Sequence, residues 1–492
     1  MSYFEPDAEL LAASDAALAS INVGRLLPAA TTFDVHDPAT EQVIASLPDH
    51  TPADALIALT KADAAGKEWA KTSPRKRSDV LHAVYAKLIE NKDTLAYVIS
   101  REMGKPLAEG YAEVQYSADY VRWFAEEALR AQGLYRDSPA GDATILVRRS
   151  PVGNAVLIAP WNFPMAMATR KIAPALAAGC ACVVKPANLT PLTTVIVLDL
   201  MIQAGVPEDL VQVITTTDAP GFSSTLLADQ RVRKISFTGS TPVGSTLMGL
   251  AAKNIVKSSM ELGGNAPLLV FDDADLERAV EGAILAKMRN GGQTCVAANR
   301  MFIQSGIADA FVEKFTAAMA AHKLGNAMNK ETTLGPVIDD RAVKRLQHLV
   351  DDAVAKGATL LTGGKSPDRP GHFFEPTVLD NVPANADIAT TEIFGPVAAI
   401  SRFDTQEEVI AKANDTEFGL AAFVFTQDLD RAINVAEALE TGMVGINNGL
   451  LSNIAAPFGG VKASGTGREG GAEGLDEYQE IRYFTMKRRE TH

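Results

Sequence analysis

The feature that most limits what this chain can fold into is an alternation of short apolar runs with longer helical patterns, which begins near residue 155. The apolar runs are rich in β-branched residues and lie at 155–160, 182–186, 211–215 and 234–239. Helical patterns separate them, at 164–178, 190–204 and 241–253. This order favours βαβ units in a twisted parallel sheet. Because ligands of such sheets bind beyond the carboxyl ends of the strands, we expect PWNFP, KPAN and TGSTPVG to lie on one edge.

A second α/β unit is predicted from residue 267 onward by the same kind of alternation. Its expected strands are 267–271, 300–304, 397–403 and 421–425, and its expected helices are 275–290 and 309–322. Residues 363–373 (GGKSPDRPGHF) have the composition of an exposed loop. The sequence thus predicts two α/β units that follow one another along the chain.

Two further kinds of segment flank these units. Residues 52–132 place apolar side chains three and four positions apart, which predicts a set of helices. Residues 134–152 alternate in short runs that indicate an extended hairpin, and residues 478–490 alternate like an edge strand. Because an isolated hairpin is only marginally stable, we expect it to pair with the 478–490 segment or with another subunit.

Length, composition and charge narrow the class of protein. A chain of 492 residues corresponds to about three domains, and its 47% hydrophobic content suits buried cores. The net charge of −14 argues against nucleic acid and anionic lipid as partners. The N-terminus lacks the basic and apolar regions of a signal peptide, and the most apolar stretch, 155–168, is too short to span a bilayer. We therefore expect a cytoplasmic protein with no membrane partner.

Several patterns that would indicate other chemistries are incomplete. The three cysteines are too few for a disulfide framework, and neither they nor the seven histidines have the spacing of a zinc site, so we expect no metal. Cys180 and Cys182 stand at the entry of an apolar run and are predicted to be core thiols. A G-x-G-x-x-G pattern at 465–470 follows no buried strand, and GKS at 364–366 has Thr359 where a phosphate-binding loop needs glycine.

Cys295 lies in a different setting, the segment RNGGQTCVAANR. Gly291 and Gly292 allow tight backbone turns there, so that a substrate can approach the thiol, and a thiolate is a strong nucleophile. Glu261 lies in MELGGNAP, between apolar neighbours, where a raised pKa would suit a general base near neutral pH. Taken singly, each residue also admits a structural role, for Glu261 that of a salt-bridged carboxylate.

Taken together, seven segments resemble, in order, the motifs of the aldehyde dehydrogenase superfamily. They are PWNFP (160–164), KPA (185–187), FTGSTPVG (237–244), MELGGNAP (260–267), GQTC (292–295), EIFGP (392–396) and PFGGVKASGTGRE (457–469). The resemblance implies an α/β fold with a parallel-sheet cofactor domain, an α/β catalytic domain and a small β oligomerisation arm. It assigns 1–133 and 153–262 to NAD(P) binding, 263–470 to catalysis, and 134–152 with 471–492 to oligomerisation. The chain is then expected to form a homodimer or homotetramer.

The same resemblance implies a reaction on an aldehyde. The thiolate of Cys295 would attack the aldehyde carbon, and the side-chain amide of Asn162 with the backbone N–H of Cys295 would hold the oxyanion. Hydride loss to a nicotinamide then leaves a thioester, which a water deprotonated by Glu261 would hydrolyse to a carboxylic acid. Members that pass the acyl group to coenzyme A generally lack that glutamate, so Glu261 favours hydrolysis.

The cofactor residues implied by the resemblance mostly follow strands of the first sheet. Lys185 would reach the adenosine ribose and its phosphate, while Gly239, Ser240 and Gly244 would lie at the pyrophosphate. The remaining members of the expected set are Pro160, Trp161, Ala187, Gly221, Thr238 and Leu262, with Glu392 and Phe394 at the nicotinamide ribose. Many NAD-preferring members carry a glutamate three residues after the lysine, where this chain has Asn188. Without that carboxylate a 2′-phosphate is tolerated, so we predict NADP as the cofactor, with NAD also possible.

Within the superfamily, the likeness is greatest to bacterial succinate-semialdehyde dehydrogenases, which act in 4-aminobutyrate degradation. It rests on the segments 167–180, 271–283, 287–300, 413–422 and 445–460. It implies that Arg170 and Arg289 converge on the far carboxylate of the aldehyde, with Ser452 as a hydroxyl donor and Phe458 beside them. Two guanidinium groups suit a carboxylate because each can form bidentate, charge-assisted hydrogen bonds.

Three alternatives stay open. One is an aldehyde longer by a methylene, glutarate semialdehyde, because a pocket discriminates a methylene by only about 1–3 kcal/mol. Another is a catalytically silent protein on this fold, and the third is a thioester hydrolase that uses Cys295 and Glu261 and binds no nicotinamide. Ala297 stands where close relatives have a second cysteine, so Cys295 has no neighbour for a local disulfide, and its oxidation would lead to a sulfenic acid or a mixed disulfide.

Overall fold

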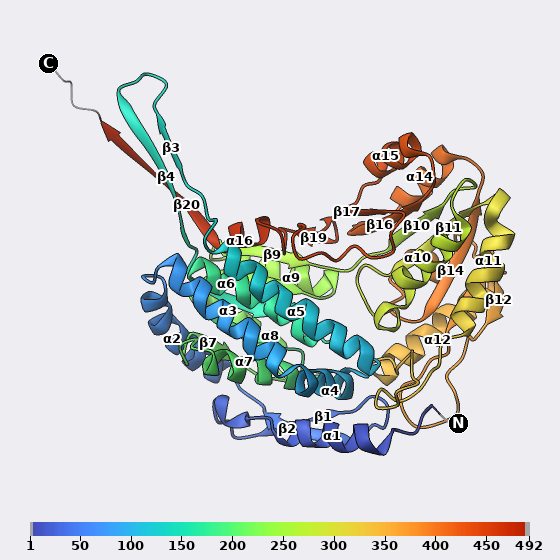
Figure 1. Cartoon of the computed structure of the whole chain (residues 1–492), viewed down its shortest axis with the longest axis horizontal. Coiled ribbons are helices and arrows are strands. Elements are labelled where there is room, and N and C mark those ends of the chain that lie inside the picture. The colour runs from blue at the N-terminus through green and yellow to red at the C-terminus, as the bar shows by residue number, and fades with distance from the viewer. Residues whose placement is uncertain (1–2, 488–492) are drawn as a thin grey trace.

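The computed structural model describes residues 3–487, which form two large sheets, each covered by helices (Figure 1). The first sheet has six strands, in the order β19 (Gly465–Thr466), β9 (Lys257–Glu261), β8 (Val232–Thr238), β5 (Asn154–Ile158), β6 (Cys182–Lys185) and β7 (Val211–Val213). All neighbours are parallel except β19, which runs antiparallel to β9. The predicted parallel sheet is confirmed, and with it the placement of PWNFP, KPAN and TGSTPVG along one edge.

The helices that connect these strands are α6 (Pro164–Ala178), α7 (Leu192–Gln203), α8 (Ala219–Ala228) and α9 (Thr241–Ala252). Three of them were predicted with bounds that agree within two residues. Helix α8 and strand β9 were not predicted, because APGFSSTLLA lacks a clear apolar stripe and KSSME begins with polar residues. β9 forms because it is paired on both sides, with β8 and β19.

The second sheet has seven strands, all parallel to their neighbours except the first pair. Their order is β12 (Thr359–Thr362), β13 (Thr377–Asp380), β14 (Val397–Phe403), β11 (Ala298–Gln304), β10 (Ala266–Val270), β16 (Ala421–Phe425) and β17 (Met443–Ile446). Its helices are α10 (Leu276–Met288), α11 (Ser305–Ala320), α12 (Asp340–Ala355), α13 (Asp387–Thr390), α14 (Gln406–Asn414) and α15 (Leu429–Ala438). The predicted second α/β unit is confirmed, and residues 363–376 contain no helix or strand, as expected for the loop at 363–373.

One predicted helix is too long. The structure ends α10 at Met288 rather than at residue 290, because Asn290 has a φ of 55° and Gly291 a φ of 61°. These are left-handed conformations that a right-handed helix cannot contain. The chain therefore leaves the helix and turns sharply just before the predicted nucleophile.

A set of long helices packs on the first sheet and on its connecting helices, and the periodicity of residues 52–132 predicted these helices. It consists of α2 (Pro52–Trp69), α3 (Pro74–Glu90), α4 (Lys92–Met103) and α5 (Leu107–Glu127). Their apolar faces and the strands of the first sheet share one large buried cluster, which also contains Cys180 and Cys182. The two thiols are 1% and 0% exposed, as expected for core residues. None of the helices between residues 3 and 487 is long and apolar enough to cross a membrane.

A third, three-stranded antiparallel sheet projects from the body (Figure 1). It consists of β3 (Leu134–Asp137), β4 (Ala143–Pro151) and β20 (Gln479–Lys487), with β4 in the centre. The predicted hairpin and its pairing with the C-terminal strand are confirmed; residues 488–490 of that predicted strand lie outside the described residues. Tyr135, Ile481 and Tyr483 are 59–69% exposed on this sheet.

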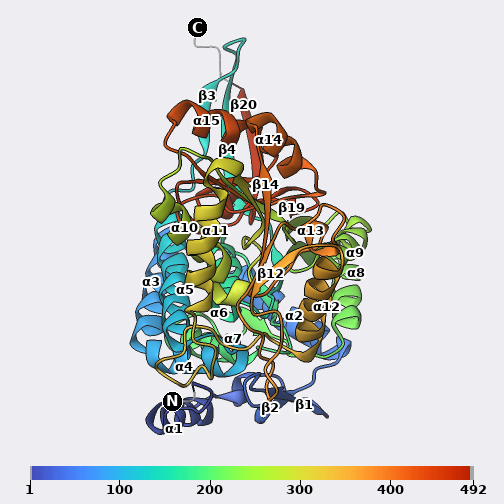
Figure 2. The same cartoon turned by 90° about the vertical axis from the view of Figure 1, so that its right-hand side faces the viewer.

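The remaining elements are short or peripheral. At the end of the molecule opposite the projecting sheet lie α1 (Ala8–Ala19), β1 (Thr32–His36) and β2 (Val43–Pro48) (Figure 2). A 3-10 turn lies at Val23–Arg25 and another at Arg289–Gly292. The last small elements are β15 (Phe418–Gly419), β18 (Val461–Lys462) and α16 (Glu473–Asp476).

Candidate active site

A cavity of about 220 Å³ lies between the two large sheets. Its wall contains most of the residues that the sequence singled out, although they come from segments nearly 300 residues apart. They are Pro160, Trp161, Asn162, Arg170, Thr238, Gly239, Ser240, Leu262, Arg289, Cys295, Glu392, Phe394, Ser452 and Phe458. The fold therefore brings the predicted nucleophile, oxyanion donor, cofactor residues and substrate arginines together in one place.

The nucleophile loop owes its shape to three consecutive residues with left-handed backbones. Asn290, Gly291 and Gly292 have φ values of 55°, 61° and 74°. A Cβ at position 292 would lie 2.2 Å from the carbonyl oxygen of Gly395, so only glycine fits there. The turn carries Cys295 to the cavity wall, three residues before β11 begins.

The thiol of Cys295 is protonated at neutral pH. Burial and the nearby carboxylate of Glu392 raise its pKa to about 12. Because the thiolate is the nucleophilic form, a base must remove this proton before Cys295 can attack a carbonyl carbon.

Glu261 ends β9 beside Thr238, its register partner on β8. Its side chain is 2% exposed, and neither carboxyl oxygen has a hydrogen-bond partner within residues 3–487. Burial, followed by the negative charge of Glu469, raises the pKa of Glu261 well above its ordinary value. A raised pKa makes an unpaired carboxylate a stronger base than usual, which is the property expected of a general base. Glu261 does not itself line the cavity but stands directly before Leu262, which does.

Asn162 follows β5 and precedes α6. Its side-chain amide donates to the carbonyl oxygen of Gln293, with an Nδ2–O distance of 2.9 Å. An amide has two N–H groups, so this bond fixes the orientation of Asn162 and leaves its second N–H for a ligand in the cavity. The arrangement suits an oxyanion donor, because the amide is held in place and Asn162 lines the same cavity as Cys295.

The edge expected to hold the cofactor contains an uncapped helix N-terminus. α9 begins after Ser240, whose side chain forms no capping hydrogen bond, so the N–H groups of the first turn have no side-chain partner there. Free N–H groups at a helix N-terminus suit a pyrophosphate. Gly244, one turn into α9, is buried, and a Cβ on it would lie 2.4 Å from the side chain of Leu262, which would have to move. These residues fit a dinucleotide.

The residues of that edge that are expected to bind the adenosine part of the cofactor do not line the cavity. Lys185 ends β6, is 4% exposed and donates to the carbonyl oxygen of Pro186; burial lowers its pKa to about 8. Ala187 and Asn188 follow it, and Asn188 is exposed. Gly221 lies in the first turn of α8, where its N–H donates to Asp218, also outside the cavity wall. The structure thus places these four residues along the edge but not in the cavity.

Glu392 lines the cavity and is hydrogen-bonded to the segment that connects the two sheets. It accepts the N–H of Gly264 at 3.0 Å, and burial raises its pKa to about 7. Arg345 of α12, which sequence reasoning missed, lines the same wall and donates to the carbonyl oxygen of Ile393 at 3.0 Å. The ring of Phe394 contacts that of Trp161 edge-on, with centroids 5.4 Å apart.

The two arginines predicted to bind the substrate are in different electrostatic states. Arg170 is 2% exposed and forms an ion pair with Glu469, which also pairs with Lys171. Arg289 donates to the hydroxyl of Ser452 at 3.2 Å, and within residues 3–487 no carboxylate lies within ion-pair distance of it. Both line the cavity, but Arg289 alone has a charge that no direct ion pair offsets.

Sequence reasoning missed several residues of the cavity wall. They are Tyr116, Phe163, Met167, Gly263, Thr294, Val296 and Arg345. Most of them are direct neighbours of predicted residues and could have been inferred from the same motifs. Tyr116 and Arg345 lie on helices far from any motif, and only the packing of α5 and α12 brings them to the site. In the part of the chain from 3 to 487, no three His, Cys, Asp or Glu side chains are grouped as a metal site would require.

Comparison with known proteins agrees with the motifs. A family model described as "Aldehyde dehydrogenase family" matches residues 27–484. A succinate-semialdehyde dehydrogenase of Paenarthrobacter nicotinovorans is 50% identical over 442 residues, covering 90% of this chain and 98% of its own. A glutarate-semialdehyde dehydrogenase of Pseudomonas putida is 49% identical, covering 92% of this chain and 94% of its own. A crystal structure of an Escherichia coli enzyme described as NADP-dependent superposes with a TM-score of 0.93 at 45% identity, covering 94% and 96% of the two chains.

Proposed function

Because the chain belongs to the aldehyde dehydrogenase family, we propose that it oxidises succinate semialdehyde to succinate with NADP. One observation carries the proposal: the wall that holds Cys295 also holds Arg289, a cation without a direct ion pair. A thiol and an unpaired guanidinium in one cavity of about 220 Å³ suit a short aldehyde that ends in a carboxylate. The similarity to a succinate-semialdehyde dehydrogenase supports the same substrate class.

The reaction begins with the protonated thiol of Cys295. Glu261 is the nearby group suited to accept its proton, since its carboxyl oxygens are unpaired and its pKa is raised. The thiolate then adds to the aldehyde carbon, and the second N–H of the Asn162 amide stabilises the negative charge on the aldehyde oxygen. A bound nicotinamide dinucleotide supplies the hydride acceptor that converts this adduct to a thioester.

The second half of the reaction needs a water and a base. Glu261 deprotonates a water that attacks the thioester carbon, Asn162 again stabilises the oxyanion, and the Cys295 thiolate leaves. The products are a carboxylic acid and the free enzyme. Before this step Glu261 releases the proton of Cys295 to solvent, and its pKa, raised by burial and by the charge of Glu469, makes the resulting carboxylate a stronger base than an ordinary one.

The cofactor would lie over the carboxyl edge of the first sheet. The first turn of α9 would bind the pyrophosphate, and Glu392 with Phe394 would hold the nicotinamide ribose. Lys185 would attract a 2′-phosphate, and the exposed Asn188 puts no negative charge beside it. The similarity to an enzyme described as NADP-dependent supports this preference, and NAD use remains compatible with an uncharged Asn188.

The substrate carboxylate would bind Arg289 and the hydroxyl of Ser452, which are already hydrogen-bonded to each other. Arg170, with Phe458 stacked 4.2 Å from its guanidinium carbon, would contribute less, because Glu469 offsets its charge. A glutarate-semialdehyde dehydrogenase among the relatives makes the longer aldehyde the second candidate substrate. One methylene changes binding in a pocket by only about 1–3 kcal/mol, so activity on both aldehydes is expected.

The assembly forms part of the same proposal. The exposed side chains of Tyr135, Ile481 and Tyr483 would be covered by a second copy, giving a cytoplasmic homodimer or homotetramer. Residues 134–152 with 471–492 would then be the oligomerisation element, beside a cofactor-binding domain of 1–133 and 153–262 and a catalytic domain of 263–470. The role in 4-aminobutyrate degradation follows from the proposed substrate.

The test is an absorbance assay of cofactor reduction with succinate semialdehyde, glutarate semialdehyde and butanal, each with NADP and with NAD. We expect the highest kcat/KM for succinate semialdehyde with NADP and the lowest for butanal, which lacks the carboxylate. Butanal oxidised as efficiently as the semialdehydes would contradict the substrate, and a ratio of NADP to NAD efficiency below one would contradict the cofactor. Failure to bind either dinucleotide, measured by intrinsic fluorescence, would favour the thioester hydrolase instead.

A further inference from the structure

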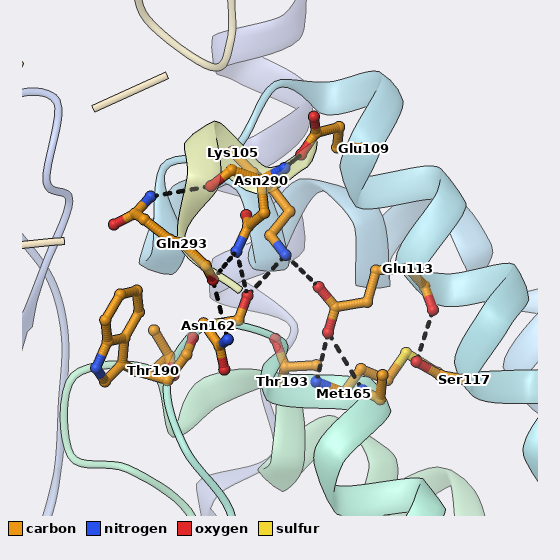
Figure 3. Close-up of polar contacts among 12 residues, drawn as sticks. Lys105, Glu109, Glu113, Ser117, Asn162, Met165, Thr190, Thr193, Asn290 and Gln293 are labelled. Atoms are coloured by element: carbon orange, nitrogen blue, oxygen red, sulfur yellow. Dashed lines mark hydrogen bonds and ion pairs between the residues drawn. The ribbon is translucent and has the colours of Figure 1, made fainter. Parts of the chain in front are cut away.

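A buried ion pair contacts the backbone of Asn162, the predicted oxyanion donor (Figure 3). Lys105, just before α5, and Glu113, on α5, approach to 2.6 Å, and their side chains are 1% and 0% exposed. Charges removed from water in this way are costly, and similar pairs elsewhere are often replaceable by apolar residues without loss of stability. Stability alone therefore does not explain the pair, and the backbone groups that it binds indicate a further role.

Each member of the pair holds a different part of the segment around Asn162. The Lys105 ammonium donates to the backbone carbonyl oxygen of Asn162 at 2.9 Å. The second oxygen of Glu113 accepts the N–H groups of Met165 at 2.9 Å and Ala166 at 3.2 Å, in the first turn of α6. The pair thus anchors the chain on both sides of Phe163 and Pro164, and fixes where Asn162 stands relative to α5.

A second link joins α5 to the nucleophile loop. Glu109, one turn before Glu113, accepts the backbone N–H of Asn290 at 2.8 Å. The side-chain amide of Asn290 donates to the carbonyl oxygens of Asn162 at 2.9 Å and Gln293 at 3.1 Å. Figure 3 shows these contacts converging on one point between α5, the Asn162 segment and the loop that leads to Cys295. The loop and the oxyanion donor are therefore held against the same helix.

We propose that Lys105 and Glu113 are positioning residues that hold the Asn162 amide at the distance from Cys295 that oxyanion stabilisation requires. The inference rests on the roles given to Asn162 and Cys295 in the proposed function. Preorganised donors act only when they are placed within a fraction of an ångström, and a misplacement of about 1 Å can cost roughly 10²-fold in rate. Lys105 sets the position of the Asn162 backbone, and Glu113 sets the start of the helix that follows it.

The chain offers a matched control for a purely structural role. Glu102, on α4, is also fully buried, and it accepts the N–H groups of Leu192 at 2.7 Å and Thr193 at 3.0 Å in the first turn of α7. Glu102 therefore accepts N–H groups at the start of α7 as Glu113 does at the start of α6, but none of the partners of Glu102 lines the cavity. A change of Glu102 should disturb folding without moving Asn162.

The experiment compares two reactions of Cys295, both without cofactor. Acylation by p-nitrophenyl acetate passes through an oxyanion, whereas alkylation by iodoacetamide does not. Cys180 and Cys182 are buried, so iodoacetamide reports on Cys295. We expect Glu113→Gln to slow acylation about 10- to 100-fold and to change the alkylation rate less than about twofold. Glu102→Gln should leave both rates near those of the wild type, even if it lowers Tm as much.

Lys105→Met provides a second variant if Glu113→Gln does not fold, since it removes the bond to the Asn162 carbonyl and leaves Glu113 to hold α6. It should show the same selective loss of acylation, and Lys105→Arg should restore part of the rate. Equal losses of acylation and alkylation in these variants, or an equal loss of acylation in Glu102→Gln, would overturn the inference. So would a wild-type enzyme whose Cys295 is not acylated.

The two proposals fail in different ways. If the wild type is acylated, Glu113→Gln shows the selective loss, and no aldehyde reduces a dinucleotide, the proposed function is wrong while the positioning role is supported. If the wild type oxidises succinate semialdehyde and Glu113→Gln acylates normally, the positioning role is wrong and the proposed function is unaffected.

Discussion

The two large sheets meet the cavity with opposite edges. The first sheet presents the carboxyl ends of its strands, since Asn162, Gly239 and Leu262 follow β5, β8 and β9. The second presents amino ends, since Gly263, Cys295 and Phe394 precede β10, β11 and β14. The reason is the connection between the sheets: β9 leaves the first sheet and β10 enters the second after only four residues, 262–265, in between.

The two edges are suited to different functions, the first to cofactor binding and the second to covalent chemistry. The carboxyl edge of the first sheet has the N-terminus of α9 and suits an anionic dinucleotide, as such edges commonly do. The amino edge of the second sheet holds loops whose shape depends on glycine and on distant contacts, as at residues 290–292. Cofactor binding and covalent chemistry are thus expected to respond independently to substitutions on the two edges.

The strongest test of this separation is Cys295→Ala, on the amino edge. Loss of the nucleophile should lower kcat for aldehyde oxidation by about 10⁴-fold or more. Binding of NADP should stay within about twofold of the wild type, because the groups expected to hold it belong to other segments. Steady-state kinetics and a fluorescence titration measure the two quantities. A large loss of NADP affinity in this variant would show that the edges do not act separately.

Glu261 is the exception to this separation, because it lies on the carboxyl edge of the first sheet but is proposed to act in the covalent chemistry. Glu261→Gln keeps the shape of the side chain but cannot accept a proton, so thioester hydrolysis should slow about 10²- to 10³-fold. The acyl group should then accumulate on Cys295 as a mass increase of the intact protein. If kcat fell without any acyl enzyme, the substitution would slow the deprotonation of Cys295 by Glu261 more than it slows thioester hydrolysis.

The two arginines allow a comparison within the substrate end of the cavity. Arg289→Ala should raise KM for succinate semialdehyde by about 10- to 100-fold, the value of a lost charge-assisted hydrogen bond, with little change in Tm. Arg170→Ala should instead lower Tm, because it takes away one of the two cations that pair with the buried Glu469. Butanal kinetics in Arg289→Ala are the control and should match the wild type. A larger KM effect at Arg170 would mean that Glu469 releases it to the substrate.

The two edges also differ in how well the sequence predicts them. The first sheet was foreseen from periodicity, because its strands are apolar and alternate with helices. β9 escaped notice because KSSME is polar at its start and is a strand only through its two neighbours. Lys105 and Glu113 had no signal at all, since charged residues are usually solvated and the burial of these two depends on how α5 packs against α6. The amino-edge loops were found through motifs alone, because no rule of sheet topology points to that edge.

The smallest effect expected is a pH dependence confined to the cofactor edge. Burial lowers the pKa of Lys185 to about 8, so its side chain is charged below that pH and becomes neutral above it. Attraction of a 2′-phosphate should weaken as the charge is lost, and kcat/KM for NADP should fall about three- to tenfold between pH 7 and pH 9 relative to that for NAD. The ratio of the two efficiencies cancels the ionisation of Cys295 and Glu261, which both cofactors share. In Lys185→Met the ratio should be low and flat over this range. A ratio that still fell with pH in that variant would assign the effect to another group on the carboxyl edge.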